Sequence, residues 1–137
     1  MATGTLGSVA GDYPRRNSVI AYPLLFASPF GAGTSVKVGT IPAGAAILRA
    51  YCTQGATPFN GGTTNTIALG TAAGGAQLVT AAAMGAASTL TTLTVLPAGI
   101  GPLTADTPVW ATYAQTGTAA TAGAGLLVIE YANPTGQ

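Results

Sequence analysis

Residues 35–70 decide the fold, and they read SVKVGTIPAGAAILRAYCTQGATPFNGGTTNTIALG. Short apolar runs in this stretch alternate with the two-residue period of β-strands: Ser35–Ile41, Ala46–Thr53 and Asn65–Gly70. The segment Ile41–Gly44 is a turn, with Pro at its second position and Gly at its fourth. Thr57–Gly62 is a loop whose Asn-Gly pair suits a positive φ. This part of the chain therefore predicts antiparallel strands joined by tight turns.

The same pattern continues on both sides of this stretch. Further apolar runs between turn residues are Val19–Phe26, Ser88–Leu96, Pro108–Gln115 and Gly125–Tyr131. Pro23 has no backbone N–H to donate, which places the first run at the edge of a sheet. Strands at intervals of about ten residues predict an all-β fold, an antiparallel β-sandwich or jelly roll of about seven or eight strands.

Two details of this prediction depend on local pattern alone. Strict alternation in the second run puts Leu48 on the face of Cys52, opposite Ile47 and Arg49. The Ala-rich segment Gln77–Ala87 departs from the strand pattern, and its composition favours a short helix or a loop.

The chain divides into an arm and one domain. Residues 1–17 are rich in Gly, Thr and Ser and lack periodicity, which predicts an extended N-terminal arm. Residues 18–137 predict a single jelly-roll-like β-sandwich. Cys52 is the only cysteine, so an intrachain disulfide is impossible, and its apolar setting indicates a small buried hydrophobic residue.

Charge is scarce throughout the sequence. Charged residues make up 5% of the chain, against about 25% in an ordinary soluble domain, and the formal net charge is +1. A net charge near zero favours association, and it offers no electrostatic footprint for nucleic acid. The sequence contains no apolar run long enough to predict a membrane span and no secretory signal pattern, so we expect a protein made in a cytoplasm.

The residue types needed for most polar catalysis are missing or few. The chain has no His, which excludes a Ser-His-Asp or Cys-His arrangement. Its three carboxylates, Asp12, Asp106 and Glu130, are spread along the sequence and have no metal-ligand spacing. The Gly-rich stretches lack the Lys and Ser/Thr of a phosphate loop. We therefore predict no enzyme, no catalytic residues, no cofactor and no metal, and the composition favours a structural subunit that binds other proteins.

Six residues are the candidate interface. Arg49 and Glu130 interrupt apolar strands, so each either points outward to water or is paired, within a sheet or across a subunit boundary. In the arm, Asp12, Tyr13, Arg15 and Arg16 are the candidates. The two arginines are either solvated or bound to an acidic neighbour, where a guanidinium can make two parallel bonds to a carboxylate.

Two parts of the chain resemble the small capsid cement, or decoration, proteins of tailed bacteriophages. They are Val36–Gly70, which contains IPAGA and FNGGTTNT, and the last strand at Leu126–Tyr131. The resemblance covers about half of the chain, and it rests on strand and turn patterns. It implies a jelly-roll domain on the outer face of an icosahedral shell in the virion, where it clamps neighbouring major capsid subunits. It also implies a homo-oligomer, for which we favour a homodimer over a trimer.

Two other classes of protein fit the composition. A tail-tip or fibre-associated receptor-binding β module is one, although the chain shows neither the repeats nor the stem that are common in fibres. A secreted carbohydrate-binding sandwich is the other, and it would need exposed aromatic side chains. Most of the aromatic residues fall within strand runs, which indicates a core position.

Overall fold

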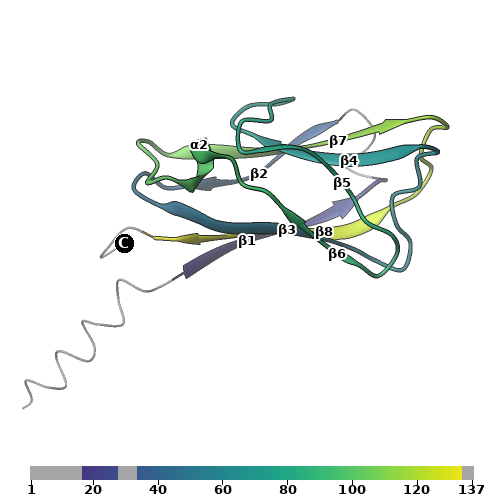
Figure 1. The fold of residues 1–137 in the computed structure, drawn as a ribbon, viewed down its shortest axis with the longest axis horizontal. Coiled ribbons are helices and arrows are strands. Elements are labelled where there is room, and N and C mark those ends of the chain that lie inside the picture. Colours follow the sequence, from purple (N-terminus) through teal and green to yellow (C-terminus); the bar gives the residue numbers. More distant parts are fainter. Residues whose placement is uncertain (1–16, 28–33, 134–137) are drawn as a thin grey trace, which may run out of the picture.

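The computed structural model describes residues 17–27 and 34–133, and within them the chain is almost entirely β. In chain order the elements are β1 (Asn17–Leu25), β2 (Ser35–Ile41), β3 (Ala46–Gln54), β4 (Thr64–Gly70), β5 (Val79–Ala83), β6 (Leu90–Leu93), the helical turn α2 (Pro97–Ile100), β7 (Thr107–Thr116) and β8 (Ala124–Ala132). Two sheets with strand orders β1-β8-β3-β6 and β2-β7-β4-β5 stack as two layers (Figure 1). The prediction of an antiparallel β-sandwich is confirmed.

The strand pairing is that of a jelly roll. All pairs are antiparallel, and they are nested: β4 pairs with β5, β3 with β6, β2 with β7, and β1 with β8. The chain is thus one long hairpin with its tip between β4 and β5. Rolling this hairpin brings β8 against β3 and β7 against β4, which divides the eight strands between the two sheets.

The core lies between the two sheets. Its largest fully buried side chains are Tyr113, Leu24, Ile41, Ile67, Leu69, Leu78, Leu127, Ile129, Val79, Val109 and Cys52. Cys52 is a free, buried thiol, as the sequence indicated. Pro23 lies in β1, an edge strand, so this prediction is also confirmed. The described residues contain no helix long and apolar enough to cross a membrane.

The Gln77–Ala87 segment forms neither a helix nor a simple loop, and the sequence prediction is wrong here. Val79–Ala83 is strand β5, which pairs with β4 across a bulge. Pairing with β4 satisfies the backbone and buries the Val79 side chain. These tertiary gains exceed the weak helix preference of the alanines.

Strict alternation fails in β3. The register of β3 against β8 shifts between Ile47 and Arg49, so Leu48 occupies a β-bulge. The extra residue turns Leu48 out to solvent and Ile47 into the core, while Cys52 stays inside. The predicted pairing of Leu48 with the buried face is therefore wrong because one residue is inserted in the ladder.

Loops close both ends of the sandwich. At one end, the Leu103 N–H donates to the Ala45 carbonyl at 2.8 Å, and the Gly44 N–H donates to the Leu103 carbonyl at 2.6 Å. Gly101 follows α2 with a φ of +77°, a conformation that favours glycine. These bonds tie the α2 segment to the start of β3.

A polar cluster closes the opposite end. The Asn65 side chain accepts hydrogen bonds from the Gly61 N–H at 2.7 Å and from the Tyr113 hydroxyl at 2.5 Å, and its amide donates to the Gly61 carbonyl at 3.1 Å. The Gln115 side chain accepts from the Ala120 N–H at 2.7 Å. Two loops are therefore fastened to β4 and β7.

Candidate interaction surface

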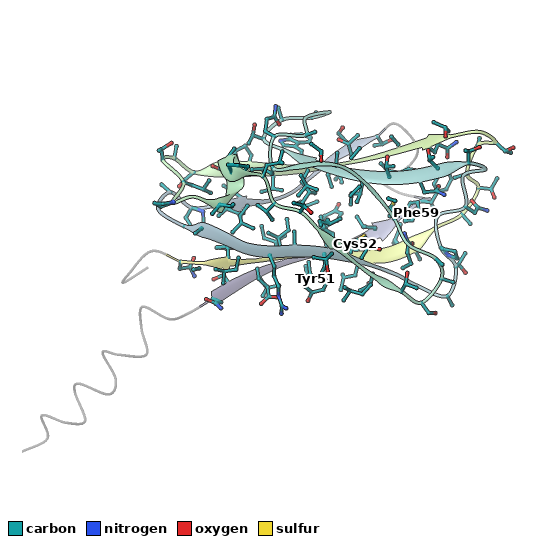
Figure 2. The ribbon with its side chains drawn as sticks, in the orientation of Figure 1. Tyr51, Cys52 and Phe59 are labelled. Atoms are coloured by element: carbon teal, nitrogen blue, oxygen red, sulfur yellow. The ribbon has the colours of Figure 1, made fainter. Side chains whose placement is uncertain are left out.

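The outer side of the β1-β8-β3-β6 sheet carries a set of exposed apolar side chains, which we call the apolar face. Its large members Val19, Leu25, Leu48, Leu90 and Leu126 are between 37% and 58% exposed. Figure 2 shows Tyr51 on this outer side, while Cys52 and Phe59 lie between the sheets. Exposed apolar side chains that gather on one face commonly mark a site of contact with another molecule, so the apolar face is a candidate interaction surface.

Strand register arranges the apolar face in transverse rows. One row joins Val19, Glu130 and Arg49 across β1, β8 and β3. The next row contains Ala21, Val128, Tyr51 and Thr92, and the row after it contains Pro23, Leu126, Thr53 and Leu90. Apolar side chains thus recur on all four strands, with Thr53 and Thr92 between them, and a pair of charges lies in one row.

Arg49 and Glu130 are directly opposite each other in this register, and they form an ion pair. The Arg49 Nε donates to Glu130 Oε2, and this bond raises the pKa of the Arg49 guanidinium above its ordinary value. The guanidinium also lies 5.5 Å from the centre of the Tyr51 ring, within the range of a cation–π contact. Of the alternatives left open by the sequence, the structure selects an ion pair within the sheet.

The ion pair remains open to solvent. The Arg49 side chain is 64% exposed and the Glu130 side chain 19%. Exposed pairs contribute little to stability, because water screens them and long side chains lose freedom. This ion pair therefore contributes little to the stability of the fold.

The outer side of the other sheet has a different character. Its outward residues are mainly small or hydroxyl-bearing: Thr64, Thr66, Ala68, Thr80, Ala81, Thr112 and Ala114. The exposed Lys37 and the half-buried Trp110, which pair across β2 and β7, lie among them. The loop after β4 also crosses part of it, since the Gly74 N–H donates to Ser35 Oγ at 2.9 Å and Ser35 Oγ lies 2.8 Å from Thr112 Oγ1. This side is polar and partly covered by the chain itself.

The structure adds no second site within the part of the chain that it describes. Asp12, Tyr13, Arg15 and Arg16 lie outside the described residues. Asp106 accepts the Ala43 N–H at 2.9 Å and so fastens a turn. Residues 17–27 and 34–133 contain no group of three His, Cys, Asp or Glu side chains that could hold a metal ion.

Most of the described aromatic side chains lie in the core or on the apolar face, whereas Trp110 of β7 is half-buried on the outer side of the other sheet. Phe59 and Tyr113 are buried, with ring centres 4.7 Å apart, and Tyr22 packs against the core. Tyr51 is half-buried beside Arg49 on the apolar face.

Sequence reasoning identified the ion pair residues but missed the apolar face around them. Val19, Leu25 and Leu126 were read as ordinary members of apolar strands. One signal was available: β1 is apolar on both sides although Pro23 marks it as an edge strand. Every strand of a two-layer sandwich has only one face against the core, so the other apolar face of β1 is exposed.

Solved structures include chains with a fold similar to this one. The sequence matches no protein-family model and no curated protein. The fold is similar to a chain in the cyanophage Pam1 capsid asymmetric unit, with a TM-score of 0.66 and 20% identity over 89% of this chain and 88% of that one. A chain in the capsid of Ralstonia phage GP4 matches with a TM-score of 0.62 and 19% identity, covering 88% of this chain and 85% of that chain.

A third similar chain comes from the acid-stable capsid of Helicobacter pylori bacteriophage KHP30. It has a TM-score of 0.59 and 14% identity over 87% of this chain and 89% of that chain. At these identities the likeness defines the fold: a jelly roll of a kind that occurs in phage capsid structures, matched over nearly the whole length of each chain.

Proposed function

We propose that this protein is a structural component of a tailed-phage virion that binds the outer face of the capsid and clamps neighbouring major capsid subunits. The observation that carries the proposal is the fold similarity, over 87–89% of this chain, to chains in three phage capsid structures. The scarcity of charge and the apolar face support a protein whose surface meets other proteins.

The clamp would act by mass action. A ligand that binds the assembled lattice, and not the separated subunits, stabilises the lattice by an amount that grows with its concentration relative to its dissociation constant. A domain seated across a boundary between subunits opposes the outward pressure of packaged DNA. No bond has to be made or broken chemically for this function.

The N-terminal arm, residues 1–17, is the part we assign to the capsid. Its anchors would be Tyr13, Arg15 and Arg16, with Asp12 beside them. An extended arm of this composition can add a strand to the sheet edge of a neighbour, and its arginines can bind carboxylates there. We also propose that the protein self-associates, as a homodimer in preference to a trimer.

Co-sedimentation with purified capsids of the same virus tests the proposal. We expect the full chain to pellet with intact shells and to remain in solution with dissociated major capsid protein. Deleting residues 2–16, or making the double variant Arg15→Ala/Arg16→Ala, should lower occupancy, whereas the control Lys37→Ala on the other sheet should not. A chain that never pellets with shells would refute the capsid role, and unchanged occupancy after the deletion would refute the role of the arm.

A further inference from the structure

We infer that the apolar face is the surface through which two copies of this chain pair, with Arg49 of each copy exchanging onto Glu130 of the other. The inference deepens the self-association in the proposed function and rests on that part of it. It assigns the two surfaces different partners: the arm to the capsid and the apolar face to a second copy.

The charges of the apolar face can complement those of a second copy of the same face. Arg49 and Glu130 lie side by side on the two central strands of the sheet, β3 and β8. A two-fold axis that lies in the interface plane, parallel to β3 and β8 and midway between them, places Arg49 of each copy opposite Glu130 of the other. Symmetric dimers use one patch twice, so the patch must complement itself in this way.

Arg49 and its apolar neighbours are exposed to solvent in the single chain. The Arg49 side chain is 64% exposed and so is free to turn from its own Glu130 toward Glu130 of the partner subunit. Val19 lies at the β1 end of this row and Leu48 directly precedes Arg49 in β3, and both are more than half exposed. Their burial would drive association, while the four charges remain paired with one another.

The shape and area of the apolar face also suit a contact between two copies. Two sheets pack face to face about 10 Å apart in β-sandwiches, so one exposed sheet fits another. Nine-residue strands rise about 30 Å and four strands span about 19 Å, which gives a footprint of about 500 Å² once the short β6 is allowed for. Two copies would bury about 1,000 Å², just below the range of stable interfaces, so we expect a dimer with a dissociation constant on the order of micromolar.

The open edge of β1 is a weaker candidate for the same contact. Pro23 in β1 removes a backbone donor, and proline on an edge strand works against strand-to-strand pairing. The outer side of the other sheet is polar and is crossed by the loop that bonds to Ser35. The apolar face therefore fits a second copy better than the β1 edge or the outer side of the other sheet.

Analytical ultracentrifugation of the full chain, from about 1 µM to about 1 mM, tests the pairing. Wild type should shift from monomer to dimer within this range. Arg49→Glu alone and Glu130→Arg alone should each weaken the dimer about tenfold or more, because each places like charges together. An equimolar mixture of the two variants should form a 1:1 heterodimer, since every contact between the copies then joins opposite charges.

Two further variants separate the interface from folding. Lys37→Glu makes the same charge change as Arg49→Glu but lies on the other sheet, so it should leave the dimer unchanged. Leu48→Ser removes exposed apolar surface without entering the core, and it should weaken dimerisation several-fold while circular dichroism stays that of wild type.

A wild type that stays monomeric over the whole range, a trimer, or a mixture that fails to associate would overturn the inference. Capsid co-sedimentation of the same variants keeps the two proposals apart. Loss of dimer with retained capsid binding leaves the capsid role intact, and a monomer whose Leu48→Ser variant no longer binds shells would reassign the apolar face to the capsid.

Discussion

The replacement Asn65→Ala should destabilise the fold more than any other single polar change at its end of the sandwich. Asn65 makes three hydrogen bonds: it accepts from the Gly61 N–H and the Tyr113 hydroxyl, and it donates to the Gly61 carbonyl. Tyr113 is completely buried, so its hydroxyl depends on protein partners. Alanine would remove all three bonds at once.

The loss of unfolding free energy depends on how many hydrogen bonds each variant removes and on which partners remain bonded. A net contribution of about 1 kcal/mol for each hydrogen bond gives about 3 kcal/mol for Asn65→Ala. The Tyr113 hydroxyl keeps Gln115 Oε1 at 3.2 Å, which lowers the expected cost to about 2–3 kcal/mol. Tyr113→Phe should cost only about 1 kcal/mol, because the Asn65 and Gln115 oxygens retain the Gly61 and Ala120 N–H donors.

Urea unfolding of both single variants and the double variant measures these costs and their coupling. The two side chains share one hydrogen bond, so the double-mutant cycle should give a coupling of about 1 kcal/mol. Thr64→Ala is the matched control, since this exposed neighbour bonds to the Thr116 hydroxyl, and it should cost under about 0.5 kcal/mol. If Asn65→Ala costs no more than the control, or if the coupling is zero, the reasoning about this cluster is wrong.

Three further outcomes are expected. Gly123→Ala should lower the free energy of unfolding by about 1–3 kcal/mol in thermal or urea melts, because the new Cβ would lie 2.5 Å from Cγ of the buried Phe59 ring; an unchanged melt would show that the ring has room to move. Burial raises the pKa of the Cys52 thiol to about 11, so a thiol reagent should label native protein at least about 100-fold more slowly than urea-unfolded protein, and equal rates would contradict its burial. The unfolded chain releases the Cys52 proton near pH 9.0, whereas the folded chain still holds it, so the free energy of unfolding should be level below about pH 9 and fall between about pH 9 and 11. Burial also raises the pKa of Tyr113, which acts in the same direction. A free energy of unfolding that rises over this range in pH-dependent melts would refute the assignment.

The sequence predicts a strand correctly where the alternation of apolar and polar residues and the turn that ends it lie within the strand's own neighbourhood. The bounds of β2 at Ser35–Ile41 agree with the prediction, because alternation ends at the Pro42 turn. It failed for β5, whose alanines carry no strand signal and whose state depends on pairing with β4. It failed again at Leu48, because one inserted residue reverses the two faces and no residue type in β3 marks the bulge.

For the candidate site, too, some residues could be identified from the sequence, whereas their contacts could not. Arg49 and Glu130 could be singled out because charges are rare in apolar strands, but their pairing joins residues 81 positions apart and required the jelly-roll register. The apolar face could not be separated from the core by composition, since Val and Leu occupy both sides of β1 and β8. Only the sheet order reveals which of these residues face solvent.

The jelly-roll register also determines how the domain responds to force. Asn17 at the start of β1 pairs with Ala132 at the end of β8, and the Asn133 side chain donates to Ser18 Oγ beside them. Tension applied between these two points pulls neighbouring strands apart across their hydrogen bonds, so the bonds break one after another from that corner, as in a zipper. The domain is mechanically weak along this direction. A shell that swells under internal pressure would be better reinforced if strain entered the domain across its sheets, where many contacts must fail together.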